Sequence, residues 1–375
     1  MNLLVFNPEH DYALADNQPQ FVALRSAAQF AYDCAPFMRY LYDNEDMVLN
    51  AYEPFGAEFR KVFRPLAEAD QVTKVIPWGW DTVVAYQLRR IGIPDTLLPT
   101  DAQLTRLREL AHRKTTIAAM EFLHDKHPHP ERLPLPPSYL TEIQHIEDFV
   151  KRTPDAIFKS PYSGNGRGHL YAHGTCSPTL LRQCEGVFKR QGSLMAEKQY
   201  AVVQDFAMEF ICQNGEVVFR GYSLFQTAHY GYAGNLLMPD KEILRTLSQH
   251  IDLEEIETTQ NLVQQFLQEQ IAPDYEGDAG VDMFVYQEEG AYRLHPFVEV
   301  NLRKTMGLAA HDIYARYCHP EARGTFHILH GPVETLRATS LQMEMQYRDG
   351  LWWSGTAILN PVTPDTQYAV VVELA

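Results

Sequence analysis

A glycine-rich loop beside two basic residues is the first feature with chemical meaning. In IFKSPYSGNGRGHL, a short apolar run carries Lys159 and opens into a loop. The loop contains Arg167 and the glycines Gly164, Gly166 and Gly168. Glycine lets the backbone approach a ligand closely, and successive N–H groups can form an anion-binding concavity. Phosphate is therefore the first candidate ligand, and the alternative is a glycine-rich hairpin with ordinary surface charges.

Carboxylates and an amide gather in a second stretch, GVDMFVYQEEGAYRLHPFVEVNLR. Asp282 lies in one predicted strand, and Glu299 and Asn301 lie in or just after the next. Alternation along a strand puts Glu299 and Asn301 on one face, and hairpin pairing can bring Asp282 beside them. Oxygen ligands of this kind suit Mg²⁺. The alternative, a solvated hairpin face, fits poorly because FVEV is too apolar for a fully exposed strand.

Strand and helix patterns alternate before these stretches. The predicted strands are 2–6, 46–52 and 74–77, and the predicted helices are 21–42, 53–64 and 81–91. This order predicts a small parallel sheet with covering helices. Ligands bind at the strand ends of such sheets, so the loops NPEHDYALADN and WGWD are candidate pocket loops. The alternative is that both are polar turns without a ligand.

The pattern changes after a predicted helix at 101–126. The strands predicted beyond it are typical of antiparallel pairing, and Asn214 with Gly215 forms a good hairpin turn between two of them. These strands are 157–159, 194–198, 206–212, 217–222, 281–286 and 293–300. Helices are predicted at 253–270 and 306–317, and the tail from 339 alternates like strands.

Composition excludes several classes of protein. The chain has 375 residues with a formal net charge of −16, which argues against non-specific nucleic-acid binding because phosphate backbones need a basic face. No apolar run approaches the roughly 20 residues of a membrane helix. None of the five cysteines forms a CxxC pair, and LLVF is cut off by NPEHD, unlike a signal peptide. We expect a cytoplasmic protein that binds neither nucleic acid nor membrane.

The order of the motifs resembles the ATP-grasp superfamily. GNGRGH lacks the Lys-Ser/Thr of a P-loop and opens no helix, so neither common nucleotide fingerprint fits. FKSPYSGNGRGH resembles the family's lysine strand and lid loop, MAEKQY its adenine hinge, and FVEVNLRKTMG its metal strand. Leu302 replaces the more usual proline after the asparagine. The resemblance covers roughly residues 104–317.

The resemblance implies ATP and Mg²⁺ (or Mn²⁺) as cofactors. Lys159 would contact the α- and β-phosphates, and Lys114 would be the second phosphate lysine, the alternative being an exposed helix lysine. The loop that closes over the β- and γ-phosphates would consist of Ser163, Gly164, Asn165, Gly166, Arg167 and Gly168. The backbone of Glu197 and Lys198 would hold adenine, and Asp205 the ribose, with Glu209 as the alternative.

The metal and catalytic residues follow from the same resemblance. Asp282, Glu299 and Asn301 would hold one or two Mg²⁺ ions. Arg303 would stabilise the transferring phosphoryl group or the acyl phosphate, and Lys159 would share in catalysis.

The resemblance also implies the fold class, α/β (α+β). We expect an ATP-grasp fold with antiparallel-sheet nucleotide-binding subdomains, preceded by a small Rossmann-like parallel α/β domain. The expected domains are 1–103, 104–193, 194–320 and a strand-rich extension at 321–375.

The expected function is an ADP-forming ligase that joins a carboxylate to an amine or thiol through an acyl phosphate. Alternatives are a small-molecule kinase of the same fold and a nucleotide-binding protein without turnover. The partners would be a small carboxylate and a small amine, whose identities the sequence leaves open. Contacts to them are expected from the N-terminal loops, at positions such as His10, Asp11, Arg25 and Trp80, and from the last third of the chain. The tyrosine-rich stretch 229–235 either lines the same cleft or is a packed loop. The oligomeric state is also open, a homo-oligomer being one of the states allowed.

Overall fold

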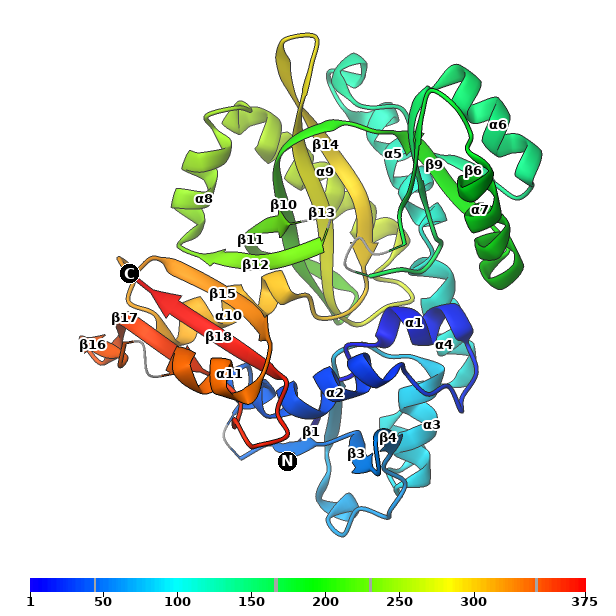
Figure 1. Cartoon of the computed structure of the whole chain (residues 1–375). Helices are drawn as coiled ribbons and strands as arrows, with labels where there is room; N and C mark the ends of the chain where they lie inside the picture. Colours follow the sequence, from blue (N-terminus) through cyan, green and yellow to red (C-terminus); the bar gives the residue numbers. More distant parts are fainter. Residues whose placement is uncertain (44, 165–167, 229–230, 341–342) are drawn as a thin grey trace. The chain divides into compact units, whose positions relative to one another are not determined.

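The computed structural model describes residues 1–43, 45–164, 168–228, 231–340 and 343–375 (Figure 1). The chain divides into two compact units. The first unit is Met1–Leu107, Ala233–Asp240 and Arg303–Ala375, and the second is Arg108–Tyr232 and Lys241–Leu302. Among the described residues, no helix combines the length and the apolar character needed to cross a membrane. The domain boundaries expected from the sequence remain a prediction, because a division at this coarser level does not test them.

A small parallel sheet organises the N-terminal part of the first unit, as predicted. Its order is β2 (Met47–Leu49), β1 (Asn2–Val5) and β5 (Lys74–Pro77), and both pairings are parallel. Side chains alternate across the sheet, so Leu4 belongs to one buried cluster and Leu3 to another. The accompanying helices are α1 (His10–Asp16), α2 (Arg25–Cys34), η1 (Ala35–Tyr40), η2 (Ala69–Gln71), α3 (Thr82–Arg90) and η3 (Asp95–Leu97).

The C-terminal part of the first unit completes the same core. Val370 and Val372 join the cluster that contains Leu4 and Phe6. Strands β15, β18, β17 and β16 are neighbours in that order, and β12 pairs with β15. Their bounds are β12 (Gly231–Leu237), β15 (Gly324–His330), β16 (Gln346–Arg348), β17 (Leu351–Ile358) and β18 (Tyr368–Leu374), with helices α10 (Met306–Tyr317) and α11 (Val333–Ser340).

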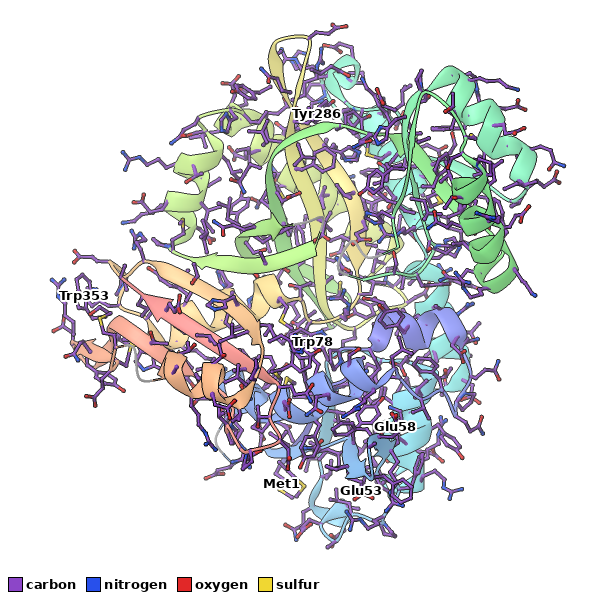
Figure 2. The ribbon with its side chains drawn as sticks, in the orientation of Figure 1. Met1, Glu53, Glu58, Trp78, Tyr286 and Trp353 are labelled. Atoms are coloured by element: carbon purple, nitrogen blue, oxygen red, sulfur yellow. The ribbon has the colours of Figure 1, made fainter. Side chains whose placement is uncertain are left out.

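The helix predicted at 53–64 is wrong. This segment holds an antiparallel hairpin of β3 (Tyr52–Phe55) and β4 (Glu58–Lys61), and Figure 2 labels Glu53 and Glu58 on its two strands. Gly56 turns the chain with a φ of 62°, a conformation that glycine adopts without strain. The hairpin register pairs Tyr52 with Lys61, and both side chains are buried.

The helix predicted at 101–126 is interrupted. The structure has α4 (Asp101–Leu110) and α5 (Lys114–Lys126), with a break at 111–113. The Arg113 backbone N–H donates to the Pro161 carbonyl at 3.2 Å instead of continuing a helix. A contact distant in sequence therefore overrides the local helical pattern, and it fixes where α5 begins.

Two antiparallel sheets form the second unit. One has the order β6-β9-β7-β8 and the other contains β14-β13-β10-β11 as neighbours. Gln264 of α9 donates to the Val217 carbonyl at 2.8 Å, and its neighbour Phe266 packs on Phe297 with ring centroids 5.6 Å apart. The bounds are β6 (Ser138–Leu140), β7 (Asp155–Lys159), β8 (Leu170–His173), β9 (Leu194–Lys198), β10 (Ala201–Gln213), β11 (Glu216–Ala228), β13 (Gly277–Glu288) and β14 (Ala291–Asn301). The remaining helices are η4 (Pro130–Arg132), α6 (Ile143–Arg152), α7 (Pro178–Gln191), α8 (Asp240–Leu247) and α9 (Leu253–Gln270).

Candidate active site

Lys159 and Glu197 share one face of the β6-β9-β7-β8 sheet. Ile157 of β7 is the register partner of Glu197, and Lys159 lies two residues further along the same face. Phe158 and Ala196 point to the opposite face, where α6 and α7 bury them. The Lys159 ammonium forms an ion pair with the Glu197 carboxylate, and both residues are buried. The Lys159 ammonium is thus a buried cation on the sheet face opposite α6 and α7.

Burial and neighbouring charges compete at Glu197. Burial alone would raise the pKa of the Glu197 carboxyl, but Lys159 and His295 outweigh it and hold the pKa at about 2. His295 reaches the carboxylate from β14 with its Nε2 at 3.6 Å. Burial lowers the pKa of His295 itself. Glu197 is therefore an ionised carboxylate that holds the Lys159 side chain in place.

Asp282, Glu299 and Asn301 lie on one face of the other sheet. The register pairs Asp282 directly with Glu299, and Gly280 with Asn301. Because residues two apart share a face, the three side chains lie side by side, as the sequence pattern predicted. Within the described ranges, no group of three or more His, Cys, Asp or Glu side chains is arranged to hold a metal ion. A metal here would need the Asn301 amide oxygen or ligand oxygens in addition to the two carboxylates.

Arg113 connects this face to the glycine-rich loop. Its guanidinium forms an ion pair with Glu299 and donates from Nη2 to the Ser163 carbonyl at 3.0 Å and to Ser163 Oγ at 3.3 Å. Arg113 is 7% exposed, whereas the predicted Lys114 begins α5 and is exposed. Sequence reasoning missed Arg113, although the Arg-Lys pair in HRKTT was its signal. The helix break decides which of the two basic residues points inward.

Two side-chain nitrogens in this region are buried, and the part of the chain that the structure describes offers them no hydrogen-bond partner. They are Nε of Arg113 and Nε2 of His169. Burial, with Arg113 and Lys159 close by, lowers the pKa of His169 to about 3. The imidazole is therefore neutral at pH 7, while two fixed cations stand beside it. The two cations and the buried N–H of Arg113 Nε suit a polyphosphate.

The remaining predicted residues are placed as follows. Gly168 has a φ of 93°, and Gly164 precedes the three residues 165–167. Asn165, Gly166 and Arg167 lie outside the described residues. The pairing of β6 with β9 ends at Ala196. The backbone of Glu197 and Lys198 therefore extends beyond the end of β6 on that edge of β9.

Asp205 and Glu209 both project from β10. Ala207 between them is the register partner of Asp282, so both acids share the face of the predicted metal residues. Glu209 is fully buried and accepts a hydrogen bond from Ser223 Oγ at 2.8 Å, whereas Asp205 is half-buried. The choice between them as a ribose ligand stays open.

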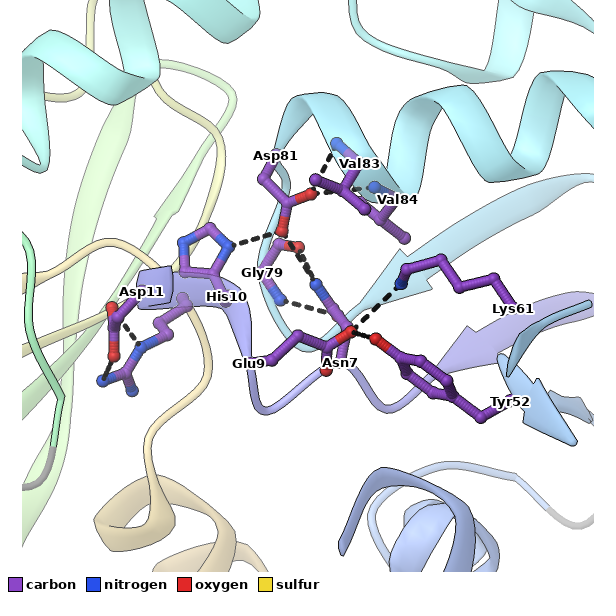
Figure 3. A network of polar contacts seen from close by, with 11 residues as sticks. Asn7, Glu9, His10, Asp11, Tyr52, Lys61, Gly79, Asp81, Val83 and Val84 are labelled. Carbon is purple, nitrogen blue, oxygen red and sulfur yellow. Dashed lines mark hydrogen bonds and ion pairs between the residues drawn. The ribbon is translucent and has the colours of Figure 1, made fainter. Parts of the chain in front are cut away.

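Arg303 belongs to the first unit, where it pairs with Asp11. Its Nη2 donates to Asp11 Oδ2 at 3.0 Å (Figure 3). Next to this pair, the loops after β1 and β5 are joined through buried polar groups. Asn7 donates to the Gly79 carbonyl at 2.8 Å, and His10 contacts Asp81. Of the substrate positions guessed from the sequence, the structure therefore gathers His10 and Asp11 beside Arg303.

Solved structures resemble this chain at low sequence identity. The biotin carboxylase domain of the 2-oxoglutarate carboxylase from Hydrogenobacter thermophilus, complexed with MgADP, is 12% identical, with a TM-score of 0.54 over 99% of this chain and 86% of that one. A biotin carboxylase β-γ-ATP complex from Campylobacter jejuni is 13% identical, with a TM-score of 0.51 over 82% and 72%. N5-carboxyaminoimidazole synthetase from Staphylococcus aureus is 10% identical, with a TM-score of 0.51 over 100% and 93%.

Sequence comparison adds no relative to these structures. No protein-family model matches the chain, and no curated protein shows significant similarity to it. The structural likenesses extend over most of the chain and agree with the motif order and with the antiparallel sheets that carry those motifs. The chain therefore has the ATP-grasp fold.

Proposed function

We propose that the protein is an ATP- and Mg²⁺-dependent ligase that joins a carboxylate to an amine or thiol and releases ADP and phosphate. The observation that carries this proposal is the arrangement within the second unit. Buried Lys159 and Arg113 provide cations, Asp282, Glu299 and Asn301 provide oxygen ligands, and the Arg113–Glu299 ion pair joins the two sets. A nucleotide polyphosphate with its metal ion has the charge pattern that complements both.

The residues present fit a magnesium ion. Two carboxylates and an amide offer only oxygen, which is the preference of Mg²⁺, and phosphate oxygens complete its coordination in nucleotide sites. When bound, the metal would neutralise charge on the phosphates. Glu299 is half-buried beside Arg113, so phosphate groups that draw the guanidinium away would leave its carboxylate available.

We propose the nucleotide contacts that the resemblance implies. Lys159 would bind the α- and β-phosphates, and the loop at 163–168 would cover the β- and γ-phosphates with its N–H groups. The β6-side edge of β9 at Glu197 and Lys198 would bind adenine. Asp205 or Glu209 would accept the ribose hydroxyls, since both share the metal-side face.

The reaction needs a carboxylate oxygen to attack the γ-phosphorus. The acyl phosphate so formed would lose phosphate when an amine attacks its carbonyl carbon. Arg303 would stabilise the developing negative charge, as a guanidinium fork can. The solved structures bound to β-γ-ATP or MgADP support ATP as the nucleotide.

We also propose the domain boundaries 1–103, 104–193, 194–320 and 321–375. All five cysteines are free, which supports the cytoplasm as the place of action.

The test is ADP release from Mg-ATP with pooled carboxylates and amines, and with each pool alone. Lys159→Ala and Glu299→Ala should each abolish turnover while circular dichroism shows an intact fold. ADP that requires both pools supports the ligase. A stable phosphorylated product without an amine requirement would instead identify a kinase. Activity retained by Glu299→Ala would contradict the metal assignment.

A further inference from the structure

A buried carboxylate in the second unit lies between a lysine and a histidine that come from different sheets. Oε1 of Glu197 in β9 pairs with Lys159 of β7 in the β6-β9-β7-β8 sheet. Its other oxygen, Oε2, lies 3.6 Å from Nε2 of His295, which belongs to β14 in the other sheet. Lys159, Glu197 and His295 are 5%, 7% and 1% exposed. The carboxylate therefore joins the two sheets of this unit through buried polar contacts.

The tautomer of His295 follows from this contact. Glu197 is ionised, so its oxygens only accept hydrogen bonds. Burial lowers the pKa of His295, so the ring is neutral at pH 7 and carries one proton. That proton is favoured on Nε2, where it faces the carboxylate, and Nδ1 keeps its lone pair. The contact is longer than an ordinary hydrogen bond, but the N–H dipole still stabilises the negative charge.

The other ring nitrogen, Nδ1, is buried, and it has no hydrogen-bond partner in the described part of the chain. The ring packs against Phe284, its register partner, and Tyr200, with ring centroids 4.7 and 5.6 Å away. A buried acceptor without a partner destabilises the folded state, and an apolar side chain in these aromatic surroundings would avoid that cost. Packing alone therefore does not explain a histidine at position 295, whereas the contact at Nε2 does.

Two partners on different oxygens fix the rotation of the Glu197 carboxylate. Oε1 faces Lys159 and Oε2 faces His295. The last torsion of a glutamate side chain is broad, so a single partner would leave the carboxylate free to turn. Lysine carries its ammonium on a flexible four-carbon stem, and it depends on a fixed anchor for its direction. The contact with His295 therefore determines where the Lys159 ammonium points.

The strand that carries His295 also carries predicted metal residues. Glu299 and Asn301 lie further along β14, which pairs with β13 on both sides of one irregularity. A strand held in this way keeps its side chains at fixed separations. The anchor of Lys159 thus has a fixed place relative to Glu299 and Asn301, although the lysine lies in a different sheet.

We propose that His295 is a positioning residue, which places the Lys159 ammonium for the nucleotide phosphates through the Glu197 carboxylate. This role rests on the proposed function, in which Lys159 binds the α- and β-phosphates. No bond forms or breaks at the imidazole, so its effect is on nucleotide affinity. In metal sites, partners that orient a ligand in this indirect way change affinity by about 10- to 100-fold when they are lost.

The experiment measures the Kd of MgADP by calorimetry in the full chain. His295→Leu removes the N–H at Nε2 and should raise this Kd about tenfold. His295→Gln can place an amide N–H near the position of Nε2, so it should bind MgADP close to the wild-type value. His295→Asn serves if the leucine variant does not fold, because its amide is too short to reach Glu197, and it should show the same weakening.

A double-mutant cycle separates positioning from a general effect on the fold. If His295 acts through Lys159, His295→Leu should add little to the Kd of Lys159→Met. His127→Leu is the matched control, because His127 is a buried histidine of the same unit whose Nε2 lies 3.4 Å from Glu255. This control should leave the Kd of MgADP unchanged, whatever it does to the free energy of unfolding in urea.

Three results would overturn this inference alone. An unchanged Kd in His295→Leu would mean that Glu197 holds Lys159 without help. Equal weakening in His295→Leu and His295→Gln would mean that the packing of the ring matters and its N–H does not. Full additivity with Lys159→Met would mean that His295 acts elsewhere. A wild-type protein that does not bind MgADP would instead refute the proposed function, and the role of His295 with it.

Discussion

Replacing Arg113 with methionine should have opposite effects on metal binding and on ATP binding. Its guanidinium pairs with Glu299 and donates to the Ser163 carbonyl at 3.0 Å. A metal ion that binds Glu299 before the nucleotide arrives must therefore displace a cation. Arg113→Met removes that competitor, and it also removes a proposed phosphate ligand. The variant should consequently bind free metal more tightly and ATP more weakly.

The magnitudes follow from the strength of charge-assisted hydrogen bonds. Such a bond contributes about 1.5–3 kcal/mol. We take about 2 kcal/mol for the pair with Glu299, because its side chain is 19% exposed and the pair is partly solvated. Each 1.4 kcal/mol is tenfold, so the Kd of Mn²⁺ without nucleotide should fall about 30-fold. The Kd of ATP should rise about tenfold to a hundredfold for the lost phosphate contact.

The assay uses electron paramagnetic resonance for Mn²⁺ binding without nucleotide, and calorimetry for ATP. Lys151→Met, an exposed charge removal in the same unit, is the control and should change neither constant. Lys114→Met distinguishes the neighbouring lysine predicted from the sequence. An unchanged Mn²⁺ affinity in Arg113→Met would show that Glu299 does not hold the metal. Weaker ATP binding in Lys114→Met alone would show that the phosphate contact belongs to Lys114.

Three further predictions concern stability. Lys159→Met leaves Glu197 without its main partner. In the wild type, the depressed pKa of Glu197 stabilises the folded state above pH 4.5, the ordinary pKa of the group, and this stabilisation is lost as the pH falls toward about 2. The loss of unfolding free energy in the variant, measured with urea, should therefore be large at pH 7 and shrink below pH 4.5. His169→Gln should reduce acid lability between pH 6.5 and about 3, because the buried imidazole resists protonation that the unfolded chain accepts; equal pH slopes for variant and wild type would contradict this. Gly79→Ala should cost about 1–3 kcal/mol by crowding His10, and an unchanged Tm would refute the close approach.

Local patterns were sufficient for the hairpins that carry the site. Asn214 and Gly215 form the predicted turn between β10 and β11, with φ values of 54° and 77°. The turn near Gln287–Gly290 sets the register as far as the pair Phe284 and His295, and an irregularity between Asp282 and Phe284 then shifts it so that Asp282 pairs with Glu299. Period-two alternation then decides which side chains share a face. The functional roles of these residues stay predictions.

Contacts distant in sequence account for what the patterns missed. The inward position of Arg113 depends on its backbone bond to Pro161, which no helical periodicity contains. The β3-β4 hairpin was mistaken for a helix, yet it places Lys61 and Tyr52 against the buried carboxylate of Glu9. An isolated window of sequence shows neither partner. Buried polar groups are satisfied by tertiary neighbours, so their positions are the least accessible to such reasoning.

The composition of the first unit has a consequence for protein synthesis. Its core joins Leu4 and Phe6 to Val370 and Val372, and the Tyr368 backbone N–H donates to Asp33 at 3.1 Å. The ribosome makes roughly 5–20 residues per second, so the first strand waits about 20–70 s for its last partner. The second unit is complete at Leu302, earlier than the first. The part of the chain that emerges first is therefore the last to finish folding, and its apolar strands stay without their C-terminal partners meanwhile.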